Sequence, residues 1–165
     1  MELYFIRHGI AQEATSFFKD EQRSLTEQGR TKTQKVAQRL KDLDLSFDLI
    51  ATSPLVRAQQ TAEILVSIGL SSQLEQCSHL APGGSAEGWV EKWLKPKNYP
   101  PSTCLGLVGH QPCLSNWAEI LIWGEVKNSL ILKKAGIIGI EIPSAAPIMG
   151  RCQMFWLTPP RYLLS

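Results

Sequence analysis

A run of four apolar residues near the start of the sequence constrains the fold more than any other feature. Residues 3–6 read Leu-Tyr-Phe-Ile, which is long enough for a buried β-strand and too short for a helix. The run ends abruptly at Arg7, His8 and Gly9, and the glycine permits a sharp turn close to a ligand. In open α/β sheets, ligands bind outside the carboxyl ends of the strands. The sequence therefore predicts a first strand that carries a cation and an imidazole into a binding site.

The residue types at this strand end favour a bound anion over a metal ion. A guanidinium repels a cation, but it can hold a phosphate through two parallel hydrogen bonds. The four cysteines, at positions 77, 104, 113 and 152, form no Cys-x-x-Cys pair, which speaks against zinc. We therefore predict no metal site, and we expect four free thiols in a reducing compartment.

Two further strand–turn–helix units are predicted along the chain. Residues 48–52 form a short apolar run, followed by a Ser-Pro pair whose serine, Ser53, we expect to cap the next helix. Arg57 lies one turn into that helix. Residues 103–108 form the clearest internal strand, and His110 follows it. Because parallel strands end at the same sheet edge, these side chains should lie near the end of the first strand.

The remaining segments complete an α/β pattern. Residues 11–23 lack periodicity and predict a loop over the end of the first strand. We also expect a helix capped by Thr26, a third strand within residues 72–78, a short helix begun by Ser85, and antiparallel strands in residues 135–142 and 152–157. Together they predict one domain over residues 1–165, a three-layer α/β/α sandwich with a mostly parallel central sheet and an antiparallel edge.

Charge and hydropathy argue against two classes of partner. The formal net charge is only +2, and the basic residues form no stripe interleaved with aromatics, so we expect no nucleic-acid binding. No apolar stretch approaches the roughly 20 residues that span a membrane. Met1 runs directly into the first strand without a signal-peptide pattern. We therefore expect a cytoplasmic protein with no membrane partner.

Two arginines and two histidines without an acidic partner in these turns would form a positive pocket. Such a pocket can neutralise a dianionic phosphoryl group and the charge that develops on its oxygens. A neutral imidazole can also act as a nucleophile near neutral pH. Other roles stay open: His8 could be hydrogen-bonded into a turn, His110 could cap its helix, and Arg57 could form a minor surface ion pair.

Four short motifs, in order along the chain, resemble those of the histidine phosphatase superfamily, the phosphoglycerate mutase-like proteins. The hallmark of that family is Arg-His-Gly after the first strand. The matching segments are Arg-His-Gly at 7–9, Leu-Thr-Glu-Gln-Gly at 25–29, Ser-Pro-Leu-Val-Arg-Ala-Gln-Gln-Thr at 53–61 and Val-Gly-His at 108–110. A lone Arg-His-Gly is a weak signal, whereas four ordered matches are a specific one.

The resemblance implies a role for each residue of the predicted pocket. His8 would be the nucleophile that carries the phosphoryl group, and water would then hydrolyse the phosphoenzyme. Arg7 and Arg57 would hold the phosphoryl oxygens, and His110 would complete the phosphate pocket as the second catalytic histidine. The resemblance implies neither a metal nor an organic cofactor.

One loop narrows the resemblance to the SixA-type branch of the superfamily. Residues 80–84 read Leu-Ala-Pro-Gly-Gly and look like the Leu-x-Pro-x-Gly of that branch, whereas broader branches place an acidic proton donor in this loop or near the first motif. Glu87 is the nearest acid and our candidate proton donor, with Glu13 as another. Either could instead be a solvated side chain.

This branch implies a protein-phosphohistidine phosphatase whose partner is a phosphorylated signalling protein of the histidine-phosphotransfer type. The phosphoramidate fits, because imidazole leaves more readily than an alkoxide and needs less help from an acid. The chain has no room for the long insertion that builds a sugar-phosphate pocket in mutases. Two other functions remain open: a small-molecule phosphomonoesterase or mutase of the same fold, and a module that binds phosphorylated partners without turnover.

Overall fold

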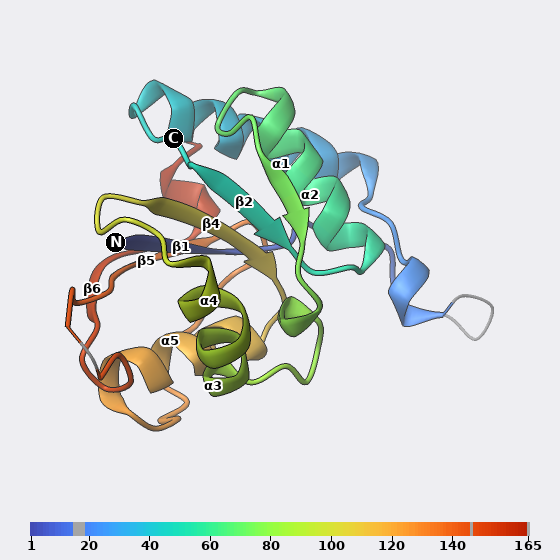
Figure 1. Cartoon of the computed structure of the whole chain (residues 1–165). Coiled ribbons are helices and arrows are strands. Elements are labelled where there is room, and N and C mark those ends of the chain that lie inside the picture. The colour runs from blue at the N-terminus through green and yellow to red at the C-terminus, as the bar shows by residue number, and fades with distance from the viewer. Residues whose placement is uncertain (15–18, 146, 165) are drawn as a thin grey trace.

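The computed structural model describes residues 1–14, 19–145 and 147–164, which form a mixed six-stranded sheet with helices on both faces (Figure 1). The strands are β1 (Glu2–Arg7), β2 (Leu49–Thr52), β3 (Leu74–Gln76), β4 (Cys104–Gly109), β5 (Ile137–Glu141) and β6 (Gln153–Thr158). The main helices are α1 (Glu27–Asp42), α2 (Val56–Ser67), α3 (Ala86–Trp89), α4 (Lys95–Lys97) and α5 (Cys113–Trp123), with a π-helical turn (Val90–Leu94) between α3 and α4.

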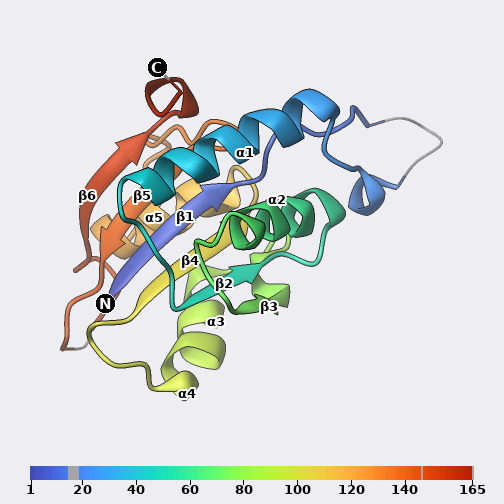
Figure 2. The same ribbon diagram turned by 90° about the horizontal axis from the view of Figure 1, so that it is seen from above.

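The sheet has the order β3-β2-β4-β1-β5-β6. The first four strands of that order are parallel, and β5 and β6 are antiparallel to their neighbours. Helices α1 and α2 cover one face, and α3, α4 and α5 cover the other (Figure 2). The predicted three-layer sandwich with an antiparallel edge is confirmed. No helix in the described part of the chain has the length and apolar character needed to cross a membrane.

Strand β1 is buried on both faces, which explains its unbroken apolar sequence. Leu3 and Phe5 pack with the core beneath α3 and α5, and Tyr4 and Ile6 pack with the core beneath α1 and α2. Burial of each such side chain contributes roughly 1.5–3 kcal/mol. The strand is therefore held firmly in the middle of the sheet, and its end has a fixed position.

The helix starts confirm two of the three predicted caps. The Thr26 hydroxyl accepts a hydrogen bond from the Gly29 amide at 3.0 Å and caps α1, and Ser85 caps α3 in the same way. The prediction for Ser53 is wrong, because α2 begins at Val56 and its N-cap residue is Leu55. Ser53 is buried before the helix, and its hydroxyl contacts a histidine of the candidate site instead.

Two other expectations have clear outcomes. The four cysteines are free thiols, as predicted. In the predicted loop over residues 11–23, residues 15–18 lie outside the described residues, and the rest contains one short helical turn (Asp20–Gln22).

Candidate active site

The backbone around His8 is fixed by three separate segments of the chain. Its amide donates to the carbonyl of Gly109 at the end of β4, and its carbonyl accepts from Ala135 before β5. The next amide, that of Gly9, donates to the Thr61 hydroxyl at 3.0 Å. That hydroxyl donates in turn to the carbonyl of Arg57 at 2.8 Å. The end of β1 is thereby tied to β4, to the segment before β5 and to α2.

The buried imidazole of His8 is held as a neutral ring with one nitrogen free to react. Burial, reinforced by the charges of Arg57 and Arg7 and by the repulsion that a protonated His110 would exert, outweighs the hydrogen bond to Gly9 and lowers the pKa of His8 to about 3. Nδ1 lies 2.7 Å from the carbonyl oxygen of Gly9, which can only accept, so we assign the hydrogen to Nδ1. Nε2 then presents its lone pair, toward which the Nε of Arg57 donates at 3.3 Å. A neutral ring with a lone pair on Nε2 is the form that a nucleophile needs.

The guanidinium of Arg57 is buried and bonded on every side. Its Nε faces His8, its Nη1 donates to the main-chain oxygen of Asp20 at 2.7 Å, and its Nη2 contacts Asp20 Oδ2 at 3.0 Å. Arg57 is the second residue of α2, so it also lies near the positive end of that helix. A phosphoryl group that binds Arg57 has to share the guanidinium with the Asp20 carboxylate.

His110 lies beside His8, with 5.2 Å between the ring centroids. Its Nε2 is 2.7 Å from the Ser53 hydroxyl, and its buried Nδ1 has no hydrogen-bond partner among the described residues. Burial and the nearby arginines lower the pKa of His110 to about 4. The site therefore holds two neutral imidazoles next to two guanidinium groups.

Arg7 completes the positive wall from the end of β1. Its Nη1 donates to the carbonyl of Leu132 at 3.0 Å, and its buried Nε has no partner among the described residues. Burial lowers the pKa of Arg7. Because buried polar groups are almost always hydrogen-bonded, the unpartnered nitrogens of Arg7 and His110 are suited to the oxygens of a bound anion.

The loop that receives Arg7 is itself anchored by a buried carboxylate. Glu119 of α5 accepts four backbone N–H bonds of 2.6–2.8 Å from the consecutive residues 127–130. Burial raises the pKa of Glu119, but these four bonds outweigh it and keep the pKa below its usual value. Only Ile131 separates residues 127–130 from Leu132, so Glu119 fixes the loop whose carbonyl holds Arg7.

Asp20 is the site residue that the sequence did not indicate. We expected no acidic partner in the three turns, and Asp20 reaches Arg57 from the loop before α1 instead. Its hydrogen bond with Arg23, at 2.8 Å, and those with Arg57 lower the pKa of Asp20. The side chain is 53% exposed, so one edge of the carboxylate faces solvent. The loop has no periodicity, and no local signal points to this contact.

The two candidate proton donors lie apart from these contacts. Glu87 is exposed in the first turn of α3, and Glu13 is exposed in the segment after β1. Among the described residues, no hydrogen bond or ion pair joins either carboxylate to the histidines or arginines of the site. The described residues also contain no cluster of histidine, cysteine and acidic side chains that could hold a metal ion.

Known proteins resemble this chain in sequence and in fold. The model of the histidine phosphatase superfamily (branch 1) matches residues 3–81. An uncharacterized protein of Picosynechococcus sp. is 46% identical over 169 residues, covering 99% of each chain. The structure of the protein histidine phosphatase SixA complexed with tungstate superposes with a TM-score of 0.84 at 24% identity, covering 99% of each chain. The alpha-ribazole phosphatase from Shigella flexneri gives a TM-score of 0.70 at 20% identity over 97% of each chain, and both likenesses establish a shared fold.

Proposed function

Because the chain belongs to the histidine phosphatase superfamily, we propose that it hydrolyses phosphohistidine on a protein through a covalent phosphoryl intermediate on His8. The observation that supports this most directly is the state of the His8 ring. Its Nδ1 is committed to the Gly9 carbonyl, and its neutral Nε2 faces the guanidinium of Arg57. The 3.3 Å contact with Arg57 is long for a hydrogen bond, so the lone pair is readily released to attack phosphorus.

The proposed reaction has two displacements at phosphorus. In the first, a bond forms between His8 Nε2 and phosphorus, the phosphorus–nitrogen bond of the substrate breaks, and the released imidazole takes a proton from solvent. In the second, water attacks, the bond to His8 breaks, and phosphate leaves. Arg7 and Arg57 would hold the phosphoryl oxygens, and His110 would close the pocket.

The choice of a phosphohistidine substrate follows from the proton balance of the site. Among the described residues, Glu87 and Glu13 form no hydrogen bond or ion pair with the histidines and arginines of the site. Asp20 is held ionised by Arg23 and Arg57. A leaving group that departs without a strong acid therefore suits this chain. The similarity in fold to SixA, named as a protein histidine phosphatase, supports the same substrate class. We also propose the cytoplasm as the location, since the four thiols are free.

A small-molecule phosphatase is the second candidate, because alpha-ribazole phosphatase shares this fold. Competing hydrolysis of sugar phosphates and of a phosphohistidine-bearing peptide decides between the two. Faster turnover of the peptide is the expected result. Efficient cleavage of sugar phosphates with the peptide left intact would assign the chain to the small-molecule class.

Trapping the intermediate tests the covalent step. We expect brief exposure to a radiolabelled phosphohistidine peptide, followed by an alkaline quench, to leave label on Nε2 of His8. His8→Asn should abolish both the label and turnover, whereas His79→Asn, at the third histidine, should retain both. Turnover by His8→Asn would rule out the covalent route, and a label that is never released would identify a binding module without turnover.

A further inference from the structure

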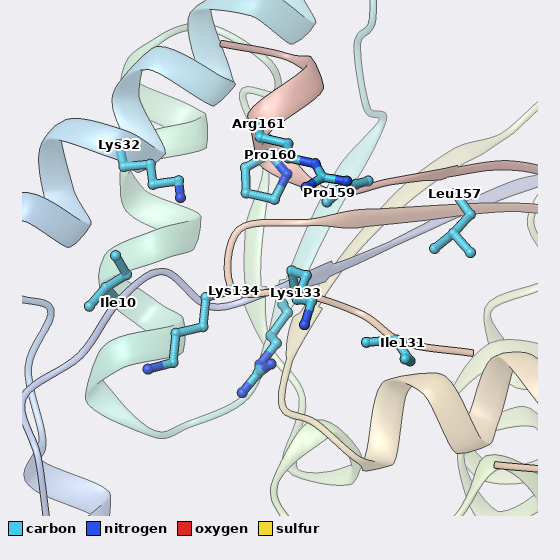
Figure 3. Close-up of a pocket in the computed structure, with 10 residues that line it drawn as sticks. Ile10, Lys32, Ile131, Lys133, Lys134, Leu157, Pro159, Pro160 and Arg161 are labelled. Atoms are coloured by element: carbon cyan, nitrogen blue, oxygen red, sulfur yellow. The ribbon is translucent and has the colours of Figure 1, made fainter. Parts of the chain in front are cut away.

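A large cationic pocket lies next to the candidate site and shares only Arg7 with it among the described residues. Its volume is about 730 Å³, and half of the ten described residues that line it are basic: Arg7, Lys32, Lys133, Lys134 and Arg161. The basic residues come from β1, from α1, from the segment before β5 and from the turn after β6 (Figure 3). No acidic residue lines it within the described part of the chain.

Within residues 1–14, 19–145 and 147–164, no ion pair neutralises the positive charge of this pocket. The ion pairs among the described residues involve none of the five basic side chains. The whole chain has 17 basic and 15 acidic residues, so such a gathering of one sign is local and not a consequence of the net charge. Uncompensated like charges attract an oppositely charged partner over distances of about a Debye length, roughly 10 Å at 0.1 M salt.

The other half of the pocket is apolar. Ile131 and Leu157 lie on one side of the pocket, and Ile10 lies on the other (Figure 3). Ile131 is 67% exposed and Leu157 is 40% exposed. Exposed aliphatic side chains gain nothing from a small anion such as phosphate. They do gain from an apolar side chain that covers them. The pocket thus suits a partner that combines carboxylates with aliphatic groups.

Arg7 connects this pocket to the candidate site. It lines the pocket, and it immediately precedes His8 in the chain. Its Nη1 is held by the carbonyl of Leu132, and Lys133 and Lys134 follow that residue directly. A single substrate chain could therefore lie in the pocket and present its phosphoryl group to His8.

We propose that this pocket docks an acidic segment of the protein substrate, with aliphatic and acidic side chains flanking the phosphorylated histidine. The proposal rests on the proposed function and adds the chemistry of the substrate surface to it. Lys32, Lys133, Lys134 and Arg161 pair with its carboxylates, and Ile131 packs against its aliphatic groups. Exposed ion pairs add up to a modest affinity and a fast encounter, as a phosphatase that releases its product requires.

Three matched peptides test the docking pocket independently of catalysis. Each carries a fluorescent label and one unphosphorylated histidine. The first has leucines and glutamates around the histidine, the second has glutamine for every glutamate, and the third has serine for every leucine. We expect the first to bind at least about tenfold more tightly than the second at low salt, and several-fold more tightly than the third. Raising the salt should weaken only the peptides that contain glutamate.

Charge reversal locates the binding site. The K133E/K134E variant should lose the preference for the acidic peptide, whereas K92E, on the opposite face of the sheet, should keep it. Equal binding of the glutamate and glutamine peptides, or equal loss in both variants, would overturn the proposal. Undiminished binding of the serine peptide would show that the pocket recognises negative charge alone, and it would overturn the proposal that aliphatic groups of a protein segment bind there. Salt dependence in the unmodified protein provides the same test should the double variant fail to fold.

The phosphorylated forms of the same peptides separate this proposal from the proposed function. We expect kcat/KM for the acidic peptide to exceed that for the glutamine peptide by about tenfold, and the ratio to approach one in K133E/K134E. Equal turnover of both peptides would refute the docking pocket alone. Charge-dependent binding without any turnover would refute the phosphatase and leave the pocket standing.

Discussion

Acid should unfold this protein through its two buried imidazoles. His8 and His110 are 6% and 3% exposed, and their pKa values are lowered to about 3 and about 4 in the folded state. In the unfolded chain a histidine has a pKa of about 6.5. The stability that depends on neutral rings is therefore complete above about pH 6.5 and is lost as the pH falls below that value. Between about pH 8 and pH 5, the unfolded chain gains nearly one proton per imidazole and the folded chain gains almost none.

The size of the effect follows from this difference in proton binding. The interval from the unfolded pKa of about 6.5 down to about pH 5 spans roughly 1.5 pH units. Over it, each imidazole lowers the free energy of unfolding by about 1.4 kcal/mol per pH unit. That is about 2 kcal/mol for each ring, or about 4 kcal/mol for the pair. Both folded pKa values lie below this interval, so the result depends little on where they fall.

Urea unfolding followed by tryptophan fluorescence, in buffer without phosphate or sulfate, measures this loss. Comparison with His8→Asn cancels the contribution of every carboxylate common to both proteins. The variant should lose about 2 kcal/mol less between about pH 8 and pH 5 than the unmodified protein, whatever its absolute stability. His110→Asn should behave alike. An equal acid loss in His8→Asn would mean that the folded ring is already protonated, and the lone pair on Nε2 would not exist.

Three other substitutions test single contacts. Asp20→Asn keeps an oxygen near Arg57 but removes the carboxylate charge that competes with phosphate. The affinity for phosphate, measured by calorimetry, should therefore rise by roughly threefold to tenfold. A lower affinity would show instead that Asp20 holds Arg57 in place. Glu119→Gln leaves two backbone N–H groups without an acceptor and should cost about 2–4 kcal/mol in urea unfolding, and no loss would mean that the loop has other acceptors. Gly29→Ala places a Cβ 2.0 Å from the carbonyl oxygen of Ile10 and should cost about 2 kcal/mol or more, with an unchanged melting temperature contradicting this close contact.

The strand ends were predictable because a short list of physical rules governs them. An apolar run of strand length, a turn and a polar residue place that residue at the carboxyl edge of a parallel sheet. Arg7, His8 and His110 each follow this pattern, and Arg57 is one step further into its helix. Register then brings Arg7 level with Gly109, directly before His110. The sequence predicts this gathering without any knowledge of side-chain positions.

The contacts that the sequence did not indicate all depend on residues without a pattern. Asp20 reaches Arg57 across 37 positions from an aperiodic loop. Ser53 looked like a helix cap, because a serine before a proline is common there, but the fold placed a histidine within reach of its hydroxyl. Lys133 and Arg161 join one pocket only after β5 and β6 have paired. Such contacts follow from tertiary packing and leave no local trace.

The position of Arg7, and with it the affinity for a ligand, depends on helix α5, which lies on the far face of the sheet from α1 and carries Glu119. The guanidinium is held by Leu132, and the path to that residue begins at the four amides clamped by Glu119. An insertion or deletion between residues 127–130 and Leu132 would shift the Leu132 carbonyl and move the guanidinium of Arg7 toward or away from a bound anion. The affinity for an anion can thus change through mutations in this connecting loop, while every side chain that would contact the anion stays the same.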